Sequence, residues 1–331
     1  MDELRGEMMR IVTGYWLSKA VFCAAKAEVA DRLAAGPKSV NALAGAAEVD
    51  EESLYRVLRA LASVGIFRET EPNVFALTDK AEYLRDDHPT SIKHSALMVG
   101  DDLFEAWSDL YHTLQTGQSA VEKRFGRDFF TEIAKDLQKS QVFDRAMQEI
   151  HGGETALMLE AVDFSRFRTV LDVGGGNGST LCGLLEGHPD LRGQLFDLPA
   201  VAENARRFVA AAGLADRVEI FSGSFFEAVQ GAADAIVLRH VLHDWSDDEC
   251  ATILSHSRAV LADGGRVLIA EKVIIPGNDP SLVKLLDLNM MAIGGKERTE
   301  RQYRELLERA GLRLETIHVT PGPTDVIEAR A

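Results

Sequence analysis

The chain has 331 residues, which suggests about two domains at ~150 residues each. Apolar residues make up 46% and charged residues 27% of the chain, a composition that is typical of a soluble globular protein and argues against long disorder. Acidic residues outnumber basic ones by 52 to 36, so the net charge is −16. A surface with that charge repels phosphate backbones and anionic lipid, and we expect neither nucleic acid nor membrane as partner.

The N-terminal segment and the cysteines bear on the cell compartment. Residues 1–7 lack the basic and then apolar layout of a signal peptide, and no stretch approaches the ~20 uninterrupted apolar residues of a spanning helix. The cysteines, Cys23, Cys182 and Cys250, are odd in number and far apart, which argues against a disulfide framework or a cysteine-rich zinc site. We therefore expect buried thiols and a cytoplasmic location.

The first part of the chain predicts a winged-helix layout. Apolar side chains recur at helical spacing over residues 7–35, and Gly36 and Pro37 end that helix. The next elements are a short helix, a longer helix and the two strands of a small hairpin, over residues 39–44, 50–63, 66–69 and 74–77. A winged helix that binds DNA places its second helix in the major groove, but here that helix begins with three acidic residues, 50–52. We expect a structural or oligomerisation role and keep DNA binding as an alternative.

Residues 80–165 are predicted to be mostly helical and are rich in large apolar side chains. We expect most of these side chains in the core, with some left to cover a pocket in the neighbouring domain. The set comprises Met98, Phe104, Trp107, Phe129, Phe130, Phe143 and Met147. The predicted division is a mostly helical, winged-helix-like dimerisation domain over 1–98 and a second domain over 99–331, in which 99–165 is a helical lead-in.

From residue 167 onward, strands alternate with helices. Buried strands are predicted over 169–173, 193–198, 218–221, 233–238 and 266–270, with two more near 314–319 and 325–329. The helices between them are predicted over 179–186, 200–212, 246–261 and 301–310. This alternation indicates the α/β class with a doubly wound, parallel sheet.

The turn after the first of these strands, residues 172–178, reads D-x-G-x-G-x-G. Gly174 and Gly176 let the backbone bend and approach a ligand closely, and Asp197 ends the second strand, where it can accept hydrogen bonds from ribose hydroxyls. A dinucleotide fingerprint is G-x-G-x-x-G; here the third glycine comes one residue early and the carboxylate of Asp172 precedes the turn. A carboxylate suits a cationic cofactor, which favours S-adenosylmethionine over a nicotinamide cofactor or a turn without ligand.

His243 directly follows the fourth strand, in the crevice where doubly wound sheets bind ligands. The segment from Ser246 to Glu249 then matches a capping box that begins the next helix. A phenol with a pKa near ~10 needs a base at neutral pH, and histidine, which titrates near ~6.5, is suited to that role. His240 lies three residues earlier, but only Asp244 is near enough in sequence to complete a metal site, so we expect no metal.

Four segments together resemble the plant-type small-molecule O-methyltransferases, which include caffeate and flavonoid enzymes and bacterial relatives that act on polyketide and phenazine products. These segments are residues 172–178, 196–199, 243–247 and 294–299, in the family's order. The helical N-terminal region also resembles the family's dimerisation domain. The resemblance implies a Rossmann-like methyltransferase sheet, a homodimer, S-adenosylmethionine as cofactor and no metal.

The resemblance also implies roles for individual residues. His243 would be the general base, and Glu271 and Glu297 would flank its ring and fix its tautomer and orientation. The methyl donor would be held by Asp172, Gly174, Gly176, Asp197, Leu198, Gly223, Ser224, Phe225 and Arg239. The acceptor would lie against Phe104, Trp107, Phe143, Met147, His240, Asn289 and Met290. Ser224 is a departure, because the family commonly has an acidic residue there, near the adenine.

We therefore predict an S-adenosylmethionine-dependent O-methyltransferase that acts on a hydroxyl of a small aromatic secondary metabolite. The alternatives are N-methylation of a heteroaromatic acceptor and a non-catalytic ligand-binding or regulatory member of the fold. The sequence does not identify the acceptor.

Overall fold

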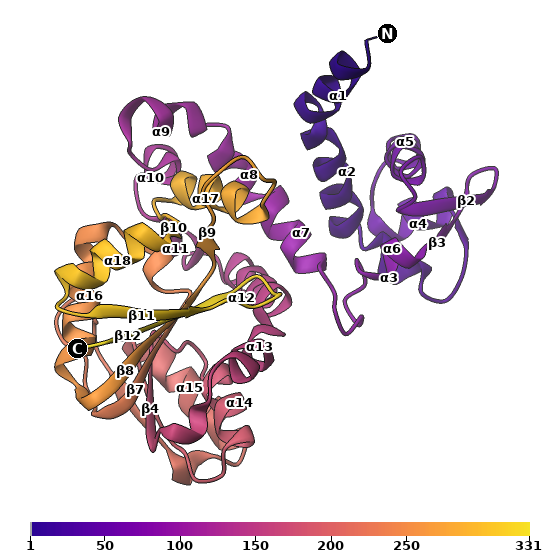
Figure 1. Ribbon diagram of the computed structural model, residues 1–331. Coiled ribbons are helices and arrows are strands. Elements are labelled where there is room, and N and C mark those ends of the chain that lie inside the picture. Colours follow the sequence, from indigo (N-terminus) through magenta and orange to yellow (C-terminus); the bar gives the residue numbers. More distant parts are fainter. Residues whose placement is uncertain (1) are drawn as a thin grey trace. The chain divides into compact units, whose positions relative to one another are not determined.

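A computed structural model describes residues 2–331 of the chain. The chain forms two compact units (Figure 1), and each is described here by itself. Unit 1 extends to Tyr111 and also includes Arg124–Gly152. Unit 2 comprises His112–Lys123 and Gly153–Ala331. The domain boundary between residues 98 and 99 stays a prediction.

Unit 1 is mostly helical. Its helices are α1 (Glu3–Val12), α2 (Gly14–Lys26), α3 (Val29–Leu33), α4 (Val40–Ala47), α5 (Glu51–Ala62), α6 (Asp79–Glu82), α7 (Lys93–Gly100), α8 (Asp102–Trp107), α11 (Phe129–Ile133) and α12 (Leu137–His151). Its strands are β1 (Lys38–Ser39), β2 (Phe67–Glu71) and β3 (Val74–Leu77), which form a small antiparallel sheet in the order β1-β3-β2.

The single helix expected over residues 7–35 is three helices. Thr13 ends α1, and its main-chain N–H and hydroxyl both donate to the carbonyl of Met9. Glu28, with a φ of 52°, takes a left-handed conformation between α2 and α3. Gly14 stands at the first break, whereas the break at Glu28 has neither glycine nor proline and leaves no signal in the apolar periodicity.

The two helices and the hairpin that follow are confirmed. Ser39 caps α4 and Asp50 caps α5, where the Asp50 carboxylate accepts a hydrogen bond from the N–H of Ser53 at 2.8 Å. Strands β2 and β3 pair antiparallel. The apolar face of α5 packs with the hairpin in one core, whose members include Leu54, Leu58, Leu61, Phe67 and Phe75.

Unit 2 is an α/β unit. Its helices are α13 (Glu154–Ala161), α14 (Ser179–Gly187), α15 (Pro199–Ala211), α16 (Asp247–Ala259), α17 (Leu282–Ile293) and α18 (Glu300–Arg309), with the short 3-10 helices η1 (Phe164–Arg166), η2 (Ala215–Arg217) and η3 (Leu242–Asp244). Two further helices, α9 (Leu110–Thr116) and α10 (Ala120–Phe125), lie where the chain passes between the units. Its strands are β4 (Thr169–Val173), β5 (Arg192–Asp197), β6 (Val218–Ser222), β7 (Ala233–Arg239), β8 (Leu261–Glu271), β9 (Val273–Ile274), β10 (Arg298–Thr299), β11 (Arg313–His318) and β12 (Asp325–Arg330).

The central sheet of unit 2 has seven strands in the order β11-β12-β8-β7-β4-β5-β6. The five strands from β4 to β8 are parallel, as predicted, but β12 pairs antiparallel with β8, and β11 antiparallel with β12. The expectation of an all-parallel sheet is therefore corrected to a mixed sheet, because the last two strands form a hairpin without a crossover helix between them.

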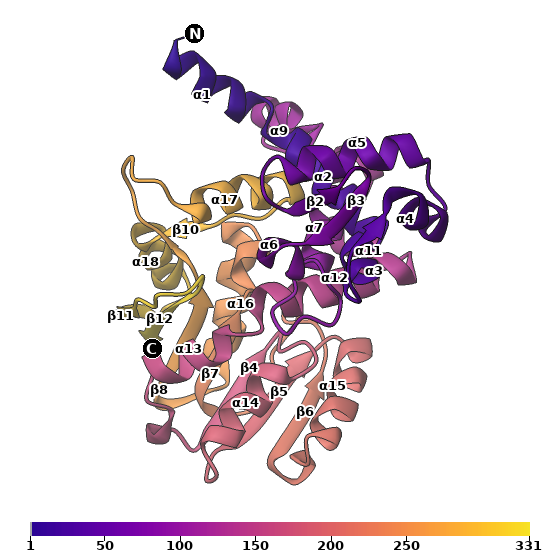
Figure 2. The same cartoon turned by 90° about the vertical axis from the view of Figure 1, so that its right-hand side faces the viewer.

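Helices cover both faces of this sheet (Figure 2). One apolar cluster joins the sheet to α16 and α18, and a second joins it to α13, α14 and α15. The strands between these layers are buried on both faces, as parallel strands generally are. The doubly wound arrangement predicted from the sequence is confirmed, and it leaves the carboxyl ends of β4 to β8 together at one edge.

Candidate active site

The glycine turn after β4 has the backbone that its sequence predicted. Gly174, Gly176 and Gly178 have φ values of 71°, 59° and 84°, in the left-handed region that glycine enters without a steric penalty. A Cβ on Gly174 would lie 2.8 Å from the side chain of Val241, whereas one on Gly176 would meet nothing within 4 Å. The turn is therefore closely packed at Gly174 and open above Gly176, as a loop that cradles a ligand requires.

The carboxylate of Asp172 lies at the base of this turn. It is 1% exposed, and its Oδ2 has no hydrogen-bond partner within residues 2–331. Burial raises its pKa to about 7, against the opposing effect of the Arg239 charge. A buried carboxylate oxygen with no partner fits a cofactor that carries cationic groups, because an ammonium or sulfonium supplies the missing charge.

Asp197 ties the end of β5 to the glycine turn. Its Oδ2 accepts from the N–H of Gly176 at 2.9 Å, and its Oδ1 accepts from the N–H of Leu198 at 2.6 Å. Each carboxylate oxygen can accept a second hydrogen bond, so both retain capacity for ribose hydroxyls. Leu198 is 55% exposed beside it.

The segment after β6 approaches the same turn. Gly223 donates its N–H to the carbonyl of Asp197 at 3.0 Å. The ring of Phe225 lies 3.8 Å from the position of a Cβ on Gly174 and packs edge-on against Phe226. The Ser224 hydroxyl accepts from the N–H of Phe226 at 3.3 Å and so shapes its own turn. Gly223, Ser224 and Phe225 thus come to the predicted donor site.

Arg239, the last residue of β7, belongs to a polar network at the carboxyl ends of the strands, where the glycine turn also lies. Its guanidinium donates to the hydroxyl of Thr180 and, at 3.2 Å, to the carboxylate of Glu154. Glu154 is 3% exposed and also lies 2.6 Å from Nε2 of His240. Glu154 has no predicted role in the site, because an acidic residue in the first turn of a helix is an ordinary stabilising feature of helices.

His243 is held by the residues predicted around it. The ring Nδ1 lies 2.9 Å from Oε1 of Glu297, which is 2% exposed. Because an ionised carboxylate only accepts, Nδ1 carries a proton and the neutral ring has its lone pair on Nε2. The predicted contact of Glu297 with the ring is present, and it leaves Nε2 to act as a base.

Glu271 differs from the expectation. Its Oε1 accepts a hydrogen bond from the main-chain N–H of His243 at 3.0 Å, rather than from the ring. Glu271 is the last residue of β8 and is fully buried, so it anchors the turn in which His243 sits. The correction follows from geometry: η3 begins one residue before His243 and presents its main-chain N–H to β8.

The surroundings of His243 are rich in negative charge. Oδ1 of Asp244 lies 3.7 Å from Nε2 of the ring. Burial disfavours the imidazolium, but the charge of Asp244, the hydrogen bond to Glu297 and the charges of both glutamates outweigh it and raise the pKa of His243 to about 9. Burial raises the pKa of Asp244 to about 7. In the unliganded protein the raised pKa of His243 favours its protonated ring at neutral pH.

The glycine pair before Glu297 is fitted to the base. Gly294 ends α17 with a φ of 108°, and a Cβ on Gly295 would lie 2.2 Å from the carbonyl oxygen of His243. The next residue, Lys296, donates its N–H to that same carbonyl at 2.7 Å. Only glycine permits this approach, which brings Glu297 beside the imidazole.

The predicted acceptor residues divide over the two units. In unit 2, the ring of His240 lies 5.3 Å from that of His243, centre to centre, and buried Met290 approaches Gly295. Asn289 precedes Met290 on α17. In unit 1, Phe104 packs on Tyr15 and Phe143 on Phe129 and Phe130, while Trp107 is 39% exposed on α8 and Met147 lies on α12. A single pocket formed by both sets stays a prediction.

Arg298 lies within the 294–299 motif and has no predicted role in the site. Its side chain is fully buried, and its guanidinium donates to the carbonyls of Leu242 and Trp245 at 2.9 and 2.8 Å. A third bond, at 3.3 Å, reaches the carbonyl of Lys296. Arg298 thus joins the His243 turn to the segment that carries Glu297. The sequence around Arg298 gives no sign that its side chain is buried, because arginine side chains are rarely buried.

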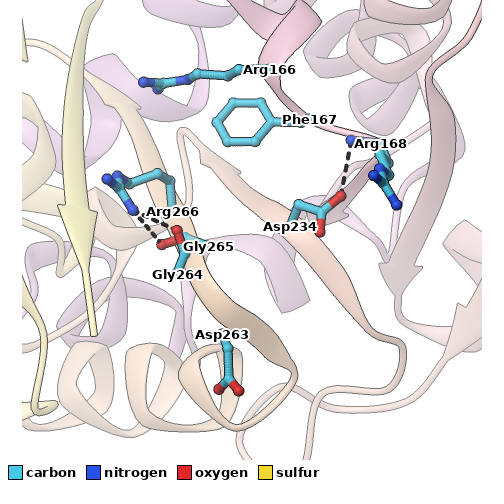
Figure 3. Close-up of a pocket in the computed structure, with 8 residues that line it drawn as sticks. All are labelled: Arg166, Phe167, Arg168, Asp234, Asp263, Gly264, Gly265 and Arg266. Carbon is cyan, nitrogen blue, oxygen red and sulfur yellow. Dashed lines mark hydrogen bonds between the residues drawn. The ribbon is translucent and has the colours of Figure 1, made fainter.

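A separate hollow of about 290 Å³ lies at the amino ends of β4 and β7 and in the first half of β8 (Figure 3). It lies at the opposite ends of the strands from the predicted site. Its polar groups are used within the fold: Asp234 accepts from the main chain of Arg168 at 2.9 Å, and Arg266 donates to the carbonyl of Gly264 at 2.6 Å. We assign no ligand to it.

Comparison with known proteins identifies the family. Residues 107–313 match the O-methyltransferase domain, and residues 9–87 match the O-methyltransferase dimerisation domain. The chain belongs to the O-methyltransferase family. It is an S-adenosylmethionine-dependent O-methyltransferase, and the fit of the Asp172 and glycine-turn geometry to a cationic cofactor agrees with that donor.

Three relatives are representative. Phenazine O-methyltransferase PhzM from Lysobacter antibioticus is 37% identical over 98% of this chain and 95% of its own. The 8-amino-8-demethylriboflavin N,N-dimethyltransferase of Streptomyces davaonensis is 35% identical over 94% and 90%. The structure of NcsB1, an O-methyltransferase from neocarzinostatin biosynthesis in complex with S-adenosylmethionine and 2-hydroxy-5-methyl naphthoic acid, matches with a TM-score of 0.85 and 33% identity over 95% of each chain.

The predictions about partners are resolved in part. The match at the N-terminus shows that this O-methyltransferase has a dimerisation domain. Within the described part of the chain, none of the helices combines the length and the apolar character that crossing a membrane requires.

Proposed function

We propose that this O-methyltransferase transfers a methyl group to a hydroxyl of a small aromatic secondary metabolite, polyketide- or phenazine-like, with His243 as general base. The observation that carries the proposal is the pair formed by His243 and Glu297, at 2.9 Å, directly after β7 in the crevice beside the glycine turn. The names of the relatives support the substrate class, since they include a phenazine enzyme and a naphthoate-bound enzyme.

The base works through its Nε2 atom. In the neutral ring, Glu297 fixes the proton on Nδ1 and Glu271 fixes the main chain of His243, so that Nε2 offers its lone pair in a defined direction. Nε2 removes the proton of the acceptor hydroxyl as the oxygen attacks. Glu297 stabilises the resulting imidazolium together with the charges of Asp244 and Glu271, against the cost of burial.

The donor site is assigned to the carboxyl ends of β4 to β7. When bound, S-adenosylmethionine supplies an electrophilic methyl group on a sulfonium. Asp172 would face its cationic groups and Asp197 its ribose hydroxyls, while Gly174 and Gly176 allow close approach of the backbone. The remaining donor residues are Leu198, Gly223, Ser224, Phe225 and Arg239. With both reactants held in this way, orientation supplies much of the rate.

A product assay tests the proposal. Candidate phenols, hydroxyphenazines, hydroxynaphthoates and aza-aromatics are incubated with donor labelled in the methyl group, and the products are analysed by mass spectrometry. We expect the label on an aromatic oxygen. Transfer to nitrogen alone would replace the O-methyl assignment, and the absence of transfer with every class would contradict the substrate class.

N-methylation is the second candidate function, because one relative that matches nearly the whole chain is named an N,N-dimethyltransferase. The two reactions separate by their need for a base. A neutral aromatic amine already has a lone pair and can lose its proton after transfer, so His243→Ala should impair O-methylation far more than N-methylation.

We also propose a homodimer formed through unit 1. The dimerisation-domain match begins at residue 9, so it covers the end of α1 and all of α2, and the exposed surface of these two helices includes large apolar side chains. Among these are Leu4, Met8, Ile11, Tyr15 and Trp16, each more than half exposed. An apolar surface of this kind is typical of a protein interface. Cys182 and Cys250 are buried as expected, but Cys23 is exposed, which corrects the expectation for that thiol. The three free thiols fit a reducing compartment, for which we propose the cytoplasm.

A further inference from the structure

Tyr303, which is not among the predicted site residues, contacts Glu271, the carboxylate that holds the main chain of His243. Tyr303 lies on α18 and is fully buried. Its hydroxyl donates a short hydrogen bond to Oε2 of Glu271. The other oxygen of that carboxylate, Oε1, accepts from the main-chain N–H of His243 at 3.0 Å. One buried carboxylate therefore connects the phenol of α18 with the peptide of the catalytic turn.

Because the surroundings of the Tyr303 hydroxyl are apolar, its hydrogen bond matters to the buried carboxylate of Glu271. The ring of Tyr303 packs in the core with Leu306, Leu307 and neighbours from α16 and the sheet, so water cannot replace the hydroxyl. Glu271 is fully buried as well, and desolvation raises its pKa. An ionised carboxylate in such a place depends on each hydrogen bond it receives.

We propose that Tyr303 is a positioning residue for methyl transfer: its hydroxyl donates to Glu271 and so favours the carboxylate and fixes its orientation, and Glu271 in turn holds the main chain of His243. The proposal rests on the proposed function, in which His243 is the base. Tyr303 touches neither reactant in this account and acts only through Glu271.

Several titratable or charged groups surround His243, and the effect of Tyr303 on its pKa must be compared with theirs. They come from its own turn, β8, the segment before β10, β10 itself and the end of β7: Asp244, Glu271, Glu297, Arg298 and His240. Asp247 and Cys250 of α16 contact Arg298. Glu271 is the member of this set that the Tyr303 hydroxyl contacts, so the hydroxyl reaches the base through that carboxylate.

The sign of the expected effect follows from this arrangement. Without the hydroxyl, Glu271 takes up a proton more readily and its charge beside His243 is lost. Since that charge helps to hold a proton on His243, the pKa of His243 falls. The rate limb that depends on the neutral base then moves to lower pH. At the same time the maximal rate decreases, because the catalytic turn is held less firmly.

The test compares pH profiles. We measure kcat and kcat/KM from pH 6 to pH 10.5 for the wild type, Tyr303→Phe, Glu271→Gln and the double variant, and we follow the His243 ring signal by NMR in the unliganded protein, whose titration the rate limb in kcat/KM reflects. We expect Tyr303→Phe to move both the rate limb and the NMR titration down by about half a pH unit or more, with a several-fold lower maximal kcat. We expect Glu271→Gln to do the same, and the double variant to add no further shift.

Controls separate the outcomes. Tyr55→Phe is the matched variant, because Tyr55 packs on Phe75 in unit 1, and its profile should equal the wild type. An unchanged titration in Tyr303→Phe, or equal and additive losses of kcat at every pH, would overturn the inference, and the NMR titration decides the case if activity is too low to measure. His243→Ala separates a failure of the proposed function from a failure of the inference about Tyr303. Full activity in His243→Ala refutes the proposed function. An inactive His243→Ala beside a wild-type-like Tyr303→Phe refutes the inference alone.

Discussion

The two sides of the candidate site differ in the groups that form them: main-chain groups on one side and buried charged side chains on the other. The proposed donor side, at the ends of β4, β5 and β6 with Arg239 from the end of β7, consists mainly of backbone: left-handed glycines and main-chain N–H groups that Asp197 organises. The base side, at the ends of β7 and β8, consists of buried charged side chains, with His243, Glu271, Glu297 and Arg298 packed together. Changes on the donor side should therefore alter binding, whereas changes on the base side should alter pH dependence and stability.

The largest effect that this comparison predicts is on the rate. His243→Ala should lower kcat at pH 7 by ~10²–10⁴-fold, the loss typical of a missing general base, and should leave the affinity for S-adenosylhomocysteine unchanged. Steady-state kinetics and calorimetry measure the two quantities. The acceptor must have a pKa above ~9, since an ionised phenol needs no base, and the variant should regain activity at high pH.

A near-wild-type kcat for His243→Ala at pH 7 would show that proximity alone carries the reaction. A large loss of donor affinity in the same variant would show that the two sides of the site are not separable as described. Wild-type kcat/KM should meanwhile rise about tenfold per pH unit up to about 9, because the pKa of His243 is raised to that value and only the neutral form acts.

The second prediction concerns stability and pH. Because the folded-state pKa of His243 is raised to about 9 from its ordinary 6.5, its contribution to the unfolding free energy is fully present below pH 6.5 and is lost as pH rises through 9. Asp244, with a pKa raised to about 7, works in the same direction. Urea unfolding of the unliganded protein should show about 2–3 kcal/mol less stability at pH 9 than at pH 6.5.

His243→Ala supplies the control for this measurement, because it should flatten most of the dependence. A wild-type stability that stays constant or increases between these pH values would contradict the description of the base side as a cluster of groups that bind protons more tightly when folded.

The third prediction is on the donor side. Asp197→Ala removes the acceptor for the N–H groups of Gly176 and Leu198 and for ribose hydroxyls, and should weaken S-adenosylhomocysteine binding by ~1.5–3 kcal/mol. The pH at which the rate rises should stay that of the wild type. Calorimetry with Asp190→Ala, at an exposed loop position, as the matched control measures the loss. Equal binding by Asp197→Ala, or tight binding of NAD, would contradict the donor assignment.

The smallest effect is expected at the helix after the base. Ser246 and Glu249 form the capping box of α16, with both reciprocal hydrogen bonds present. Ser246→Ala should lower the unfolding free energy by about 1 kcal/mol and change kcat little, because the box lies outside the contacts that hold His243. Ser255→Ala, a hydroxyl bonded within the same helix to Ala251, is the control and should cost less. A severe loss of activity in Ser246→Ala would show that the capping box also helps to hold His243.

The sequence carried the fold of unit 2 well, for physical reasons. Buried parallel strands need long apolar runs, and turns such as 172–178 need glycine where φ is positive, so both leave a trace in the residue types. The break at Glu28 left none, because it depends on how α2 and α3 pack. The antiparallel pairing of β12 was also hidden, since a strand's residues do not record the direction of its neighbour.

The site could be predicted to the level of its motifs. His243 and Glu297 were placed correctly beside each other, but Glu271 was assigned to the ring when it holds the peptide. Arg298 and Tyr303 were missed. Their importance comes from partners far away in sequence that only the folded chain brings to them, such as Leu242 for the guanidinium and Glu271 for the phenol.

The hairpin of β11 and β12 has a consequence for how copies of the chain associate. Strand β11 lies at the edge of the large sheet, where unpaired N–H and C=O groups invite another strand. A bulge at Glu315 interrupts its register, and the Glu315 carboxylate pairs with Arg266 at 2.8 Å. Kinked and charged, this edge is a poor template for sheet extension into fibrils. Association of two copies of the chain through β11 is thereby disfavoured.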